Sequence, residues 1–380
     1  AGITGTNGKT TTSSLLKQIW EFAWMEAGLI GTIGIEIGQD RFSASHTTPE
    51  ADQLHNILSI MQERHIRAAA IEVSSHALSL NRVDGAYFSA AAFTNLTQDH
   101  LDFHGDMESY YQAKKKLFNA QSCQTAFINV DDAYGARLAG EIAMVPTTIS
   151  RRDSKAHWYY QEIKSSSKGY EVEVRGRDGI LISGQLNLIG EHNLDNALMA
   201  MAIAFESGVD PLVIGNSLIT LKGALGRLES IDCGQEFLAL VDYAHTPDAV
   251  EKVLATLREN SSAKIIAILG CGGNRDKSKR PLMGKALLSG SDIAIFTSDN
   301  PRDEDPGEIL KEMLGSLIVN SPSAVIADRQ SAIKYGVERA QTGDILVVLG
   351  KGHEVGQEIK GVKLPFSDQD VLQKCIEAEL

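Results

Sequence analysis

The sequence predicts an α/β fold made of two successive domains, and three observations support this prediction. A glycine-rich loop at residues 5–10 joins a short apolar segment to a helical one. Apolar runs of strand length then alternate with helical stretches, as in a parallel sheet covered by helices. A second series of the same kind starts near Phe237. We therefore expect a phosphate-loop domain over residues 1–225 and a Rossmann-like domain over residues 226–380.

The predicted elements follow one another in a regular order. A strand at residues 1–4 leads into the loop, and a helix is expected from Thr11. At residues 147–188 the sequence consists of short, polar segments in which polar and apolar residues alternate. This pattern predicts a small antiparallel addition to the parallel sheet. A helix is expected again at residues 193–206. Further buried strands are predicted at residues 68–71, 90–93, 126–129, 238–243, 264–269, 292–297, 324–327 and 344–349.

Composition and charge exclude several classes of function. The chain has 380 residues with a formal net charge of -13, and nucleic acid needs a basic surface, so it is not the expected partner. Four scattered cysteines without a close pair indicate neither a disulfide framework nor a zinc site. No apolar run approaches the length of about 18 residues that a membrane span needs, and no signal peptide is recognisable. We expect a soluble cytoplasmic protein with no membrane insertion.

The loop at residues 5–10, with the sequence GTNGKT, is the most informative motif of the chain. Its glycines allow backbone N–H groups to surround phosphate oxygens, and the helix that follows directs its positive end at the anion. Lys9 would contact the β- and γ-phosphates and the Thr10 hydroxyl would ligate Mg²⁺. A chance glycine turn is the alternative. ATP is the expected ligand, and its predicted contacts are Gly5, Thr6, Asn7, Gly8, Lys9, Thr10 and Thr11.

Polar side chains follow two of the predicted strands. Glu72 comes after residues 68–71, and it is either a Mg²⁺ ligand beside the nucleotide or a solvated loop residue. His100 lies in the polar segment after residues 90–93, where it could bind a second cation. A histidine that merely caps or turns the chain before the next helix is equally compatible with the sequence.

Lys114 is the one charged residue on a predicted helix face that is otherwise apolar. A lysine on such a face tends to lose its proton, and a neutral amine can react with CO₂ to form a carbamate that binds Mg²⁺. A lysine whose end reaches solvent is the alternative, and helix geometry alone favours it. The stripe consists of Met107, Tyr110, Tyr111, Lys114, Leu117 and Phe118.

Taken together, the motifs resemble those of the Mur ligases, ATP-dependent amide-forming enzymes of peptidoglycan precursor synthesis. The resemblance covers nearly the whole chain and is greatest to the branch that adds the third amino acid to a UDP-linked muramoyl dipeptide. The motifs stand in the order typical of that family, at residues 5–10, 47–50, 72–76, 99–102, 105–107, 242–247 and 350–354.

This resemblance implies roles for individual residues. Thr10, Glu72 and His100 would approach Mg²⁺, and Lys114 matches the family's carbamylated lysine, which reverses the interpretation from helix geometry. The muramoyl dipeptide would contact Thr47, Thr48, Ser74 and Arg82. ATP would further contact Asn196, Arg227 and Asp242. The incoming amino acid would contact Arg275, Asp299, Asn300, Pro301, Arg302, Gly350 and Glu354.

Arg302 suggests which amino acid is added. Its planar guanidinium, like that of Arg275, suits a carboxylate, and meso-diaminopimelate has a distal carboxylate that lysine lacks. The resemblance therefore implies UDP-MurNAc-dipeptide and meso-diaminopimelate as substrates, with ATP and Mg²⁺ as cofactors. An exposed Arg302 that only answers the acids at residues 303–305 is the alternative.

Three other functions stay open at this point: a lysine-adding Mur ligase, a ligase like folylpolyglutamate synthetase, and a non-catalytic nucleotide-binding regulatory protein. Two departures from the family pattern also matter. Nothing in the sequence corresponds to the family's N-terminal uridine-binding domain, so weak binding of the UDP group is expected. Leu80 stands where some relatives have a glutamine near the substrate. We expect a monomer.

Overall fold

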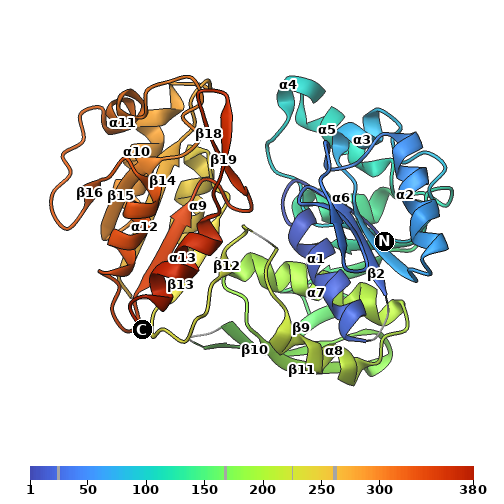
Figure 1. The fold of residues 1–380 in the computed structure, drawn as a ribbon. Coiled ribbons are helices and arrows are strands. Elements are labelled where there is room, and N and C mark those ends of the chain that lie inside the picture. Colours follow the sequence, from blue (N-terminus) through green and yellow to red (C-terminus); the bar gives the residue numbers. More distant parts are fainter. Residues whose placement is uncertain (24–25, 167–168, 225, 260–262) are drawn as a thin grey trace. The chain divides into compact units, whose positions relative to one another are not determined.

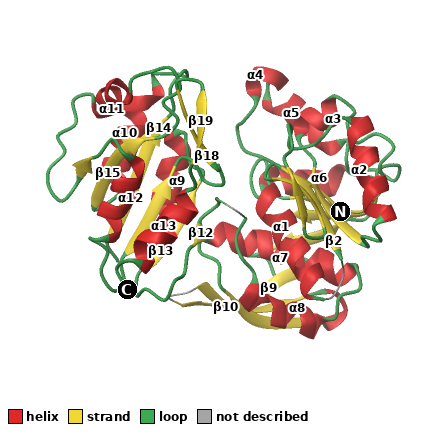
Figure 2. Cartoon of the chain, viewed as in Figure 1, coloured by secondary structure: helices red, strands yellow, loops and turns green. Residues whose placement is uncertain are grey.

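The computed structural model describes residues 1–23, 26–166, 169–224, 226–259 and 263–380. The chain forms two compact units, Ala1–Lys222 and Gly223–Leu380, each an α/β arrangement of helices packed on a sheet (Figures 1 and 2). The predicted α/β fold class is therefore confirmed. The boundary that the sequence predicts at residue 225 falls on a residue outside the described ones.

The first unit is built on one sheet with the strand order β11-β10-β9-β8-β7-β6-β1-β5-β2-β3-β4. Strands β2, β5, β1, β6, β7 and β8 run parallel, whereas β3 and β4 extend the sheet as an antiparallel edge. The bounds are β1 (Gly2–Thr4), β2 (Ala27–Gly31), β3 (Gly34–Ile37), β4 (Asp40–Phe42), β5 (Ala68–Glu72), β6 (Phe88–Phe93), β7 (Cys123–Asn129), β8 (Thr147–Ser150), β9 (Trp158–Ser166), β10 (Gly169–Arg175) and β11 (Leu181–Leu186).

The antiparallel addition predicted at residues 147–188 continues this sheet. β8 pairs in parallel with both β7 and β9, so the antiparallel pairing begins only between β9 and β10. Its inward side chains, among them Trp158 and Val174, join the same hydrophobic core as α1 and α7. The addition thereby enlarges one core.

Helices cover both faces of the first sheet. On one face α1 and α7 pack together, with Leu15, Ile19 and Leu198 fully buried. The opposite face buries Leu54, Leu78 and other side chains of α2, α3, α5 and α6. The helices are α1 (Lys9–Phe22), α2 (Ala51–Glu63), α3 (Ser75–Ser79), α4 (Leu101–His104), α5 (Met107–Lys115), α6 (Ala133–Glu141), α7 (Glu191–Glu206) and α8 (Pro211–Ser217), with short 3-10 turns at Arg177–Gly179 and Leu218–Thr220.

The second unit has a six-stranded sheet in the order β12-β13-β17-β14-β15-β16, parallel except for β12, and a separate hairpin of β18 and β19. A mostly parallel sheet of this kind agrees with the Rossmann-like domain that the strand and helix series predicts. The strands are β12 (Glu229–Ser230), β13 (Leu238–Asp242), β14 (Ile265–Cys271), β15 (Ile293–Ser298), β16 (Ala324–Val325), β17 (Ile345–Leu349), β18 (Gly356–Ile359) and β19 (Val362–Pro365). The helices are α9 (Pro247–Glu259), α10 (Lys279–Gly290), α11 (Pro306–Leu314), α12 (Arg329–Val337) and α13 (Asp368–Glu377).

Several predicted bounds were wrong by a few residues. The first helix begins at Lys9 and not at Thr11, because Gly8 takes a left-handed conformation with φ of 86° and ends the loop directly before it. Helix α5 ends at Lys115, so Leu117 and Phe118 lie beyond it, although both are buried. Among the described residues, no helix is both long enough and apolar enough to cross a bilayer.

Candidate active site

The loop at residues 5–10 follows β1, and β1 lies between β5 and β6 in the sheet. The carboxyl edge of a parallel sheet is where ligands bind in such folds. Gly5 and Gly8 have φ values of 149° and 86°, which side chains rarely adopt. A Cβ atom on Gly8 would also lie 2.3 Å from Oδ1 of Asn196. Both backbone shape and space therefore require glycine in this loop.

Residues that follow β6 hold the loop in place. Asn95 accepts hydrogen bonds from the backbone N–H of Asn7 through its Oδ1 (2.9 Å) and from that of Thr6 through its carbonyl (2.9 Å). Thr94 donates its hydroxyl to the carbonyl of Asn7 at 2.6 Å. The sequence prediction missed both residues, although they stand in the polar segment after the strand. They fix the backbone of the loop before any ligand binds.

Lys9 and Lys114 both contact the carbonyl of Gly5. Their Nζ atoms donate to it over 3.0 and 2.8 Å, and Lys9 also donates to the Thr6 carbonyl at 3.0 Å. Lys114 is only 1% exposed. Burial, helped by the charge of Lys9, holds the pKa of Lys114 well below its usual 10.5. Lys114 therefore does not extend to solvent, as the alternative interpretation required, and its burial favours the neutral amine.

Glu72 is the last residue of β5 and is completely buried, so the alternative of a solvated loop residue was wrong. Its Oε2 accepts the hydroxyl hydrogen bonds of Thr10 (2.9 Å) and Thr32 (3.1 Å), and its Oε1 accepts the N–H of Thr32 (2.9 Å). Burial raises the pKa of Glu72, while the charge of Lys9 and these bonds oppose the rise. Thr32, which follows β2, gave no recognisable pattern in the sequence.

The four residues expected near the muramoyl dipeptide are connected to Glu72. Thr48 donates its hydroxyl to the Glu72 carbonyl at 2.8 Å and accepts the N–H of Ser74 at 3.1 Å. Arg82 donates to the Thr48 carbonyl at 3.2 Å. The hydroxyl of Thr47 lies 3.1 Å from that of Thr32, which itself binds Glu72. These residues therefore form one continuous hydrogen-bond network at the ends of β2 and β5.

His100 lies at the N-terminal end of α4 with φ of 52°. Its imidazole is 47% exposed, and Nε2 lies 3.4 Å from the Asp99 carboxylate. Rings of His76 and His100 meet edge to face, with centroids 4.9 Å apart. This position agrees with the turn histidine that the sequence also allowed, and it leaves the imidazole accessible to a ligand.

The donor atoms around the loop fit Mg²⁺. Thr10 supplies a hydroxyl and Glu72 a carboxylate, both hard oxygen ligands within hydrogen-bond distance of each other. In the part of the chain that the structure describes, no three His, Cys, Asp or Glu side chains are arranged to hold a metal ion by themselves. An ion here would need the oxygens of a bound phosphate as well, which is the usual coordination of Mg²⁺ in nucleotide sites.

Asn196, on α7, lies against the loop. It is buried, and its Oδ1 accepts the hydroxyl of Thr12 at 3.3 Å while its Nδ2 donates to Asn193 at 3.3 Å. Asn196 is far from the loop in the sequence, and the packing of α1 on α7 brings the two together.

In the second unit the predicted nucleotide contacts lie at the end of β13. The carboxylate of Asp242 accepts the N–H groups of Leu228 (2.7 Å) and Ala244 (2.8 Å), and burial raises its pKa. Arg227 is exposed, with its guanidinium carbon 5.2 Å from the centre of the Tyr243 ring. Asp242 thus shapes the backbone of two loops, whereas Arg227 is accessible from solvent.

The residues expected to bind the amino acid follow β15 and β17. Arg302 has φ of 51°, donates to the Gly273 carbonyl at 2.7 Å and pairs with Glu358 at 3.3 Å. The alternative in which it answers the acids at residues 303–305 was therefore wrong. Pro301 is buried beside it, and Arg275 is exposed. The loops that carry Gly350 and Asp299 lie close together, because a Cβ atom on Gly350 would be only 2.8 Å from Oδ2 of Asp299.

Comparison with known proteins identifies this arrangement as that of an amide-forming ligase fold. Residues 3–204 match the Mur ligase middle domain, and residues 226–352 match the Mur ligase, glutamate ligase domain. The chain belongs to the Mur ligase family, which confirms the resemblance inferred from its motifs. Members of this family are ATP-dependent ligases, and the chain is one of them.

Three individual proteins show how similar the relatives are. The UDP-N-acetylmuramoyl-L-alanyl-D-glutamate--2,6-diaminopimelate ligase of Streptomyces coelicolor is 44% identical over 99% of this chain and 75% of its own length. A solved structure of a ligase with the same name superposes with a TM-score of 0.77 at 38% identity, covering 100% of this chain and 78% of that one. Folylpolyglutamate synthase of Mycobacterium tuberculosis, solved with ADP and AMPPCP, has a TM-score of 0.64 at 16% identity, covering 92% and 87%, and shares the fold alone.

Proposed function

We propose that this chain adds meso-diaminopimelate to UDP-MurNAc-L-Ala-D-Glu at the expense of ATP, in the synthesis of peptidoglycan precursors. The observation that supports this most is the meeting of Lys9, Thr10, Glu72 and Lys114 at one phosphate loop. The Streptomyces coelicolor relative, 44% identical and aligned over 99% of the chain, supports the choice of substrates. The compartment we propose is the bacterial cytoplasm, and the form is a monomer.

The reaction needs two steps because a carboxylate is a poor acyl donor. In the first, the side-chain carboxylate of D-glutamate attacks the γ-phosphorus of ATP, giving an acyl phosphate and ADP. In the second, the amine of the incoming amino acid attacks the acyl carbon, phosphate leaves and the amine loses a proton. Both reactants of the first step are anions, so positive charge must be gathered around them.

The first unit supplies this positive charge. The backbone N–H groups of the loop and the N-terminus of α1 would hold the phosphates, with Lys9 rotating from its bonds to the loop carbonyls onto the γ-phosphate. Thr10 and Glu72 would hold one Mg²⁺, which when bound neutralises phosphate charge and orients the transferred group. Asn196, Arg227 and Asp242 would complete nucleotide binding. Thr47, Thr48, Ser74 and Arg82 would bind the muramoyl dipeptide.

We further propose that Lys114 is carbamylated. Its neutral amine forms an N–C bond with CO₂ and releases one proton, so a buried base becomes a buried anion. Together with His100, that carbamate would hold a second Mg²⁺. The low exposure of Lys114 and its lowered pKa support this assignment, because a permanently charged ammonium at this place is costly.

The second unit would select the amino acid. Residues 226–380 form the amino-acid-binding domain in this proposal, and residues 1–225 the ATP-binding domain. Arg302, with Arg275, would bind the distal carboxylate of meso-diaminopimelate as a planar pair of donors. Asp299, Asn300, Gly350 and Glu354 would bind the end of the molecule that reacts.

Substitution of Arg302 tests the choice of amino acid. Lysine lacks the distal carboxylate and leaves the guanidinium unpaired, so it should be poorer by about 2–5 kcal/mol, or roughly 30- to 5,000-fold in kcat/KM. Arg302→Ala should raise the KM for meso-diaminopimelate and leave the KM for ATP unchanged. Arg302→Lys should restore little, because an ammonium cannot present two parallel donors.

The same kinetic assays separate the alternatives. A lysine-adding ligase would use lysine at least as well as meso-diaminopimelate. A folylpolyglutamate synthetase would release phosphate with a folate and glutamate and would ignore the muramoyl dipeptide. A regulatory protein would bind ATP and release no phosphate with any substrate pair.

A further inference from the structure

A second lysine in the molecule is completely buried and has no role in the function proposed above. Lys351 follows β17 directly after Gly350 and is 0% exposed. Its Nζ donates to Oδ1 of Asn300 at 3.0 Å and to Oε2 of Glu354 at 3.0 Å. Burying an ammonium costs several kcal/mol unless specific partners compensate it, so a lysine in this place needs an explanation.

We propose that Lys351 is a positioning residue of the amino-acid site, which fixes the Asn300 carboxamide and the Glu354 carboxylate in the orientation that receives the substrate. This inference rests on the proposed function, since it assigns Lys351 to a site that the proposal places at the ends of β15 and β17. Lys351 itself would not contact the amino acid, because its side chain is completely buried.

The hydrogen bonds fix which way the Asn300 carboxamide points. Its Oδ1 accepts two bonds, from Lys351 and from the N–H of Glu358 at 3.0 Å, and its Nδ2 donates to Oε2 of Glu354 at 2.8 Å. With nitrogen and oxygen exchanged, the amide donors would face the ammonium and an N–H, and the amide oxygen would face a carboxylate. Only one orientation is therefore possible, and Lys351 is one of the three groups that fix it.

The same bonds leave defined groups for a ligand. Oε2 of Glu354 is occupied by Lys351 and Asn300, whereas Oε1 makes no hydrogen bond with the residues that the structure describes. The Glu354 side chain is 35% exposed, so this oxygen can be reached. The Nδ2 atom of Asn300 carries a second proton, and the fixed plane of the amide determines the direction in which this proton can be donated. One acceptor and one donor suit the ammonium and the carboxylate of an amino acid.

The charge of Lys351 also keeps Glu354 ionised. Burial opposes the charge on this carboxylate, but attraction to Lys351 and the hydrogen bonds from Asn300 and Lys351 outweigh it, so the pKa of Glu354 lies below its usual value. An ionised Glu354 is what an incoming ammonium group requires.

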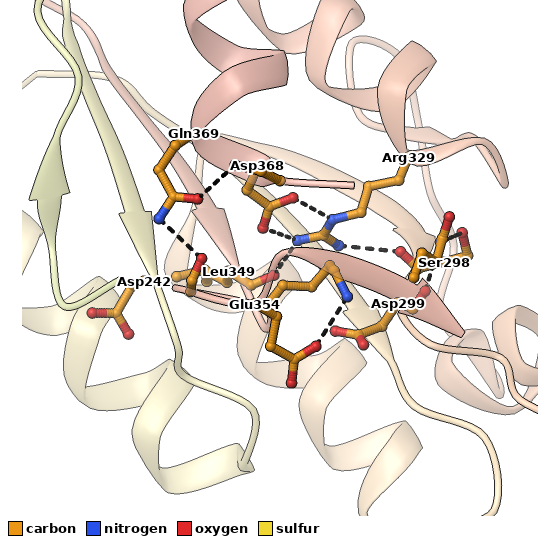
Figure 3. Close-up of polar contacts among 12 residues, drawn as sticks. Asp242, Ser298, Asp299, Arg329, Leu349, Glu354, Asp368 and Gln369 are labelled. Atoms are coloured by element: carbon orange, nitrogen blue, oxygen red, sulfur yellow. Dashed lines mark hydrogen bonds and ion pairs between the residues drawn. The ribbon is translucent and has the colours of Figure 1, made fainter. Parts of the chain in front are cut away.

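A different buried cation holds the backbone of the two loops. Arg329 binds Asp368 through Nε and Nη2, both at 2.7 Å, and donates to the carbonyls of Ser298 at 3.1 Å and Leu349 at 2.9 Å (Figure 3). Ser298 and Leu349 are the last residues of β15 and β17. Loss of Lys351 should therefore disturb the side chains of the site while the strand ends stay in place.

The test is Lys351→Met, which keeps the length of the side chain and removes its charge. In the wild-type chain with ATP, Mg²⁺ and UDP-MurNAc-L-Ala-D-Glu, the KM for meso-diaminopimelate is measured from phosphate release. We expect the variant to raise this KM about 10- to 100-fold, the usual effect of losing a supporting contact behind a ligating group. The KM values for ATP and for the muramoyl dipeptide should stay within about twofold.

Lys17→Met is the matched control. Lys17 lies on α1 in the other unit, with a side chain 9% exposed and ion pairs to Glu21 (2.7 Å) and Glu36 (2.9 Å). It should lower the melting temperature without changing any KM. If Lys351→Met leaves the KM for meso-diaminopimelate unchanged, or moves all three KM values together, the inference is wrong. A wild-type chain without amino-acid-dependent phosphate release would instead contradict the proposed function.

A double-mutant cycle with Glu354→Gln shows whether Lys351 acts through its partner. If it does, the double variant should raise the KM for meso-diaminopimelate by clearly less than the product of the two single effects, whereas two independent effects would multiply. Multiplying effects would overturn the inference. Should Lys351→Met alone fail to fold, the double variant, which removes both charges of the pair, is compared directly with Glu354→Gln. A further rise in KM of about 10-fold or more, as large as the effect expected of Lys351→Met by itself, would overturn the inference.

Discussion

Replacement of Lys114 by methionine should separate activity from stability. The native side chain is 1% exposed and donates one hydrogen bond, to the carbonyl of Gly5 at 2.8 Å. Losing that bond costs about 0.5–1.5 kcal/mol. Removing a buried amine whose pKa is lowered by desolvation returns a similar amount, so the free energy of unfolding should change by less than about 1 kcal/mol.

Activity should fall far more. If a carbamate on Lys114 helps to stabilise the charge that develops during phosphoryl transfer, its loss should lower kcat by about 10²- to 10³-fold, or about 2.7–4 kcal/mol. Removal of bicarbonate should lower wild-type activity, and a short carboxylic acid should partly rescue Lys114→Ala. Lys114→Met should respond to neither, because its side chain fills the space.

The pH dependence of stability gives an independent check in bicarbonate-free buffer. The folded-state pKa of Lys114 lies well below 10.5, so the unfolded chain binds more protons between the two values. Wild-type stability should therefore increase relative to Lys114→Met as the pH rises through this window. Phosphate release and thermal unfolding measure the two effects. A fully active Lys114→Met would rule out a catalytic carbamate on Lys114, and a variant with the same pH profile of stability as the wild type would rule out a lowered pKa for this amine.

Three further substitutions have defined outcomes. Glu72→Gln should lower kcat about 10²-fold or more with little loss of stability, since burial already raises the pKa of that carboxyl; unchanged turnover would count against its role. Gly8→Ala should weaken ATP binding and cost about 1–3 kcal/mol, because its φ is 86° and its Cβ would meet Asn196; calorimetry with equal affinity would contradict this. Asp368→Asn should destabilise the chain by about 3–5 kcal/mol, and joint replacement of Asp368 by Leu and Arg329 by Met should recover only part of it in urea denaturation, because the carbonyls of Ser298 and Leu349 lose their donor; an equally unstable double variant would disprove the buried-pair argument.

The sequence allowed the fold and one side of the site to be predicted well. The phosphate loop could be recognised because its chemistry depends on glycines and one lysine at fixed spacing, and apolar runs marked the strands on both sides of it. The helix start at Lys9 was missed by two residues, because the left-handed φ of Gly8 does not show in the residue pattern. The burial of Lys114 was not predicted from helix geometry, which favoured a lysine that reaches solvent; only the resemblance to the Mur ligases reversed that interpretation.

The supporting residues of the site could not be predicted from local pattern. Thr32 reaches Glu72 only because β2 and β5 are neighbours in the sheet, and Lys351 reaches Asn300 only because β15 and β17 end at the same edge. Such contacts join residues tens of positions apart, so they depend on strand order. A fully buried lysine also looks like any other loop lysine in a sequence.

We expect this chain to use ATP to join meso-diaminopimelate to the muramoyl dipeptide. The most direct measurement incubates it with ATP, Mg²⁺ and UDP-MurNAc-L-Ala-D-Glu, with meso-diaminopimelate, lysine or no amino acid, and follows phosphate together with the mass of the product. We expect one phosphate for each tripeptide formed, with meso-diaminopimelate strongly preferred. Equal use of lysine, or phosphate release that does not depend on an amino acid, would contradict the account.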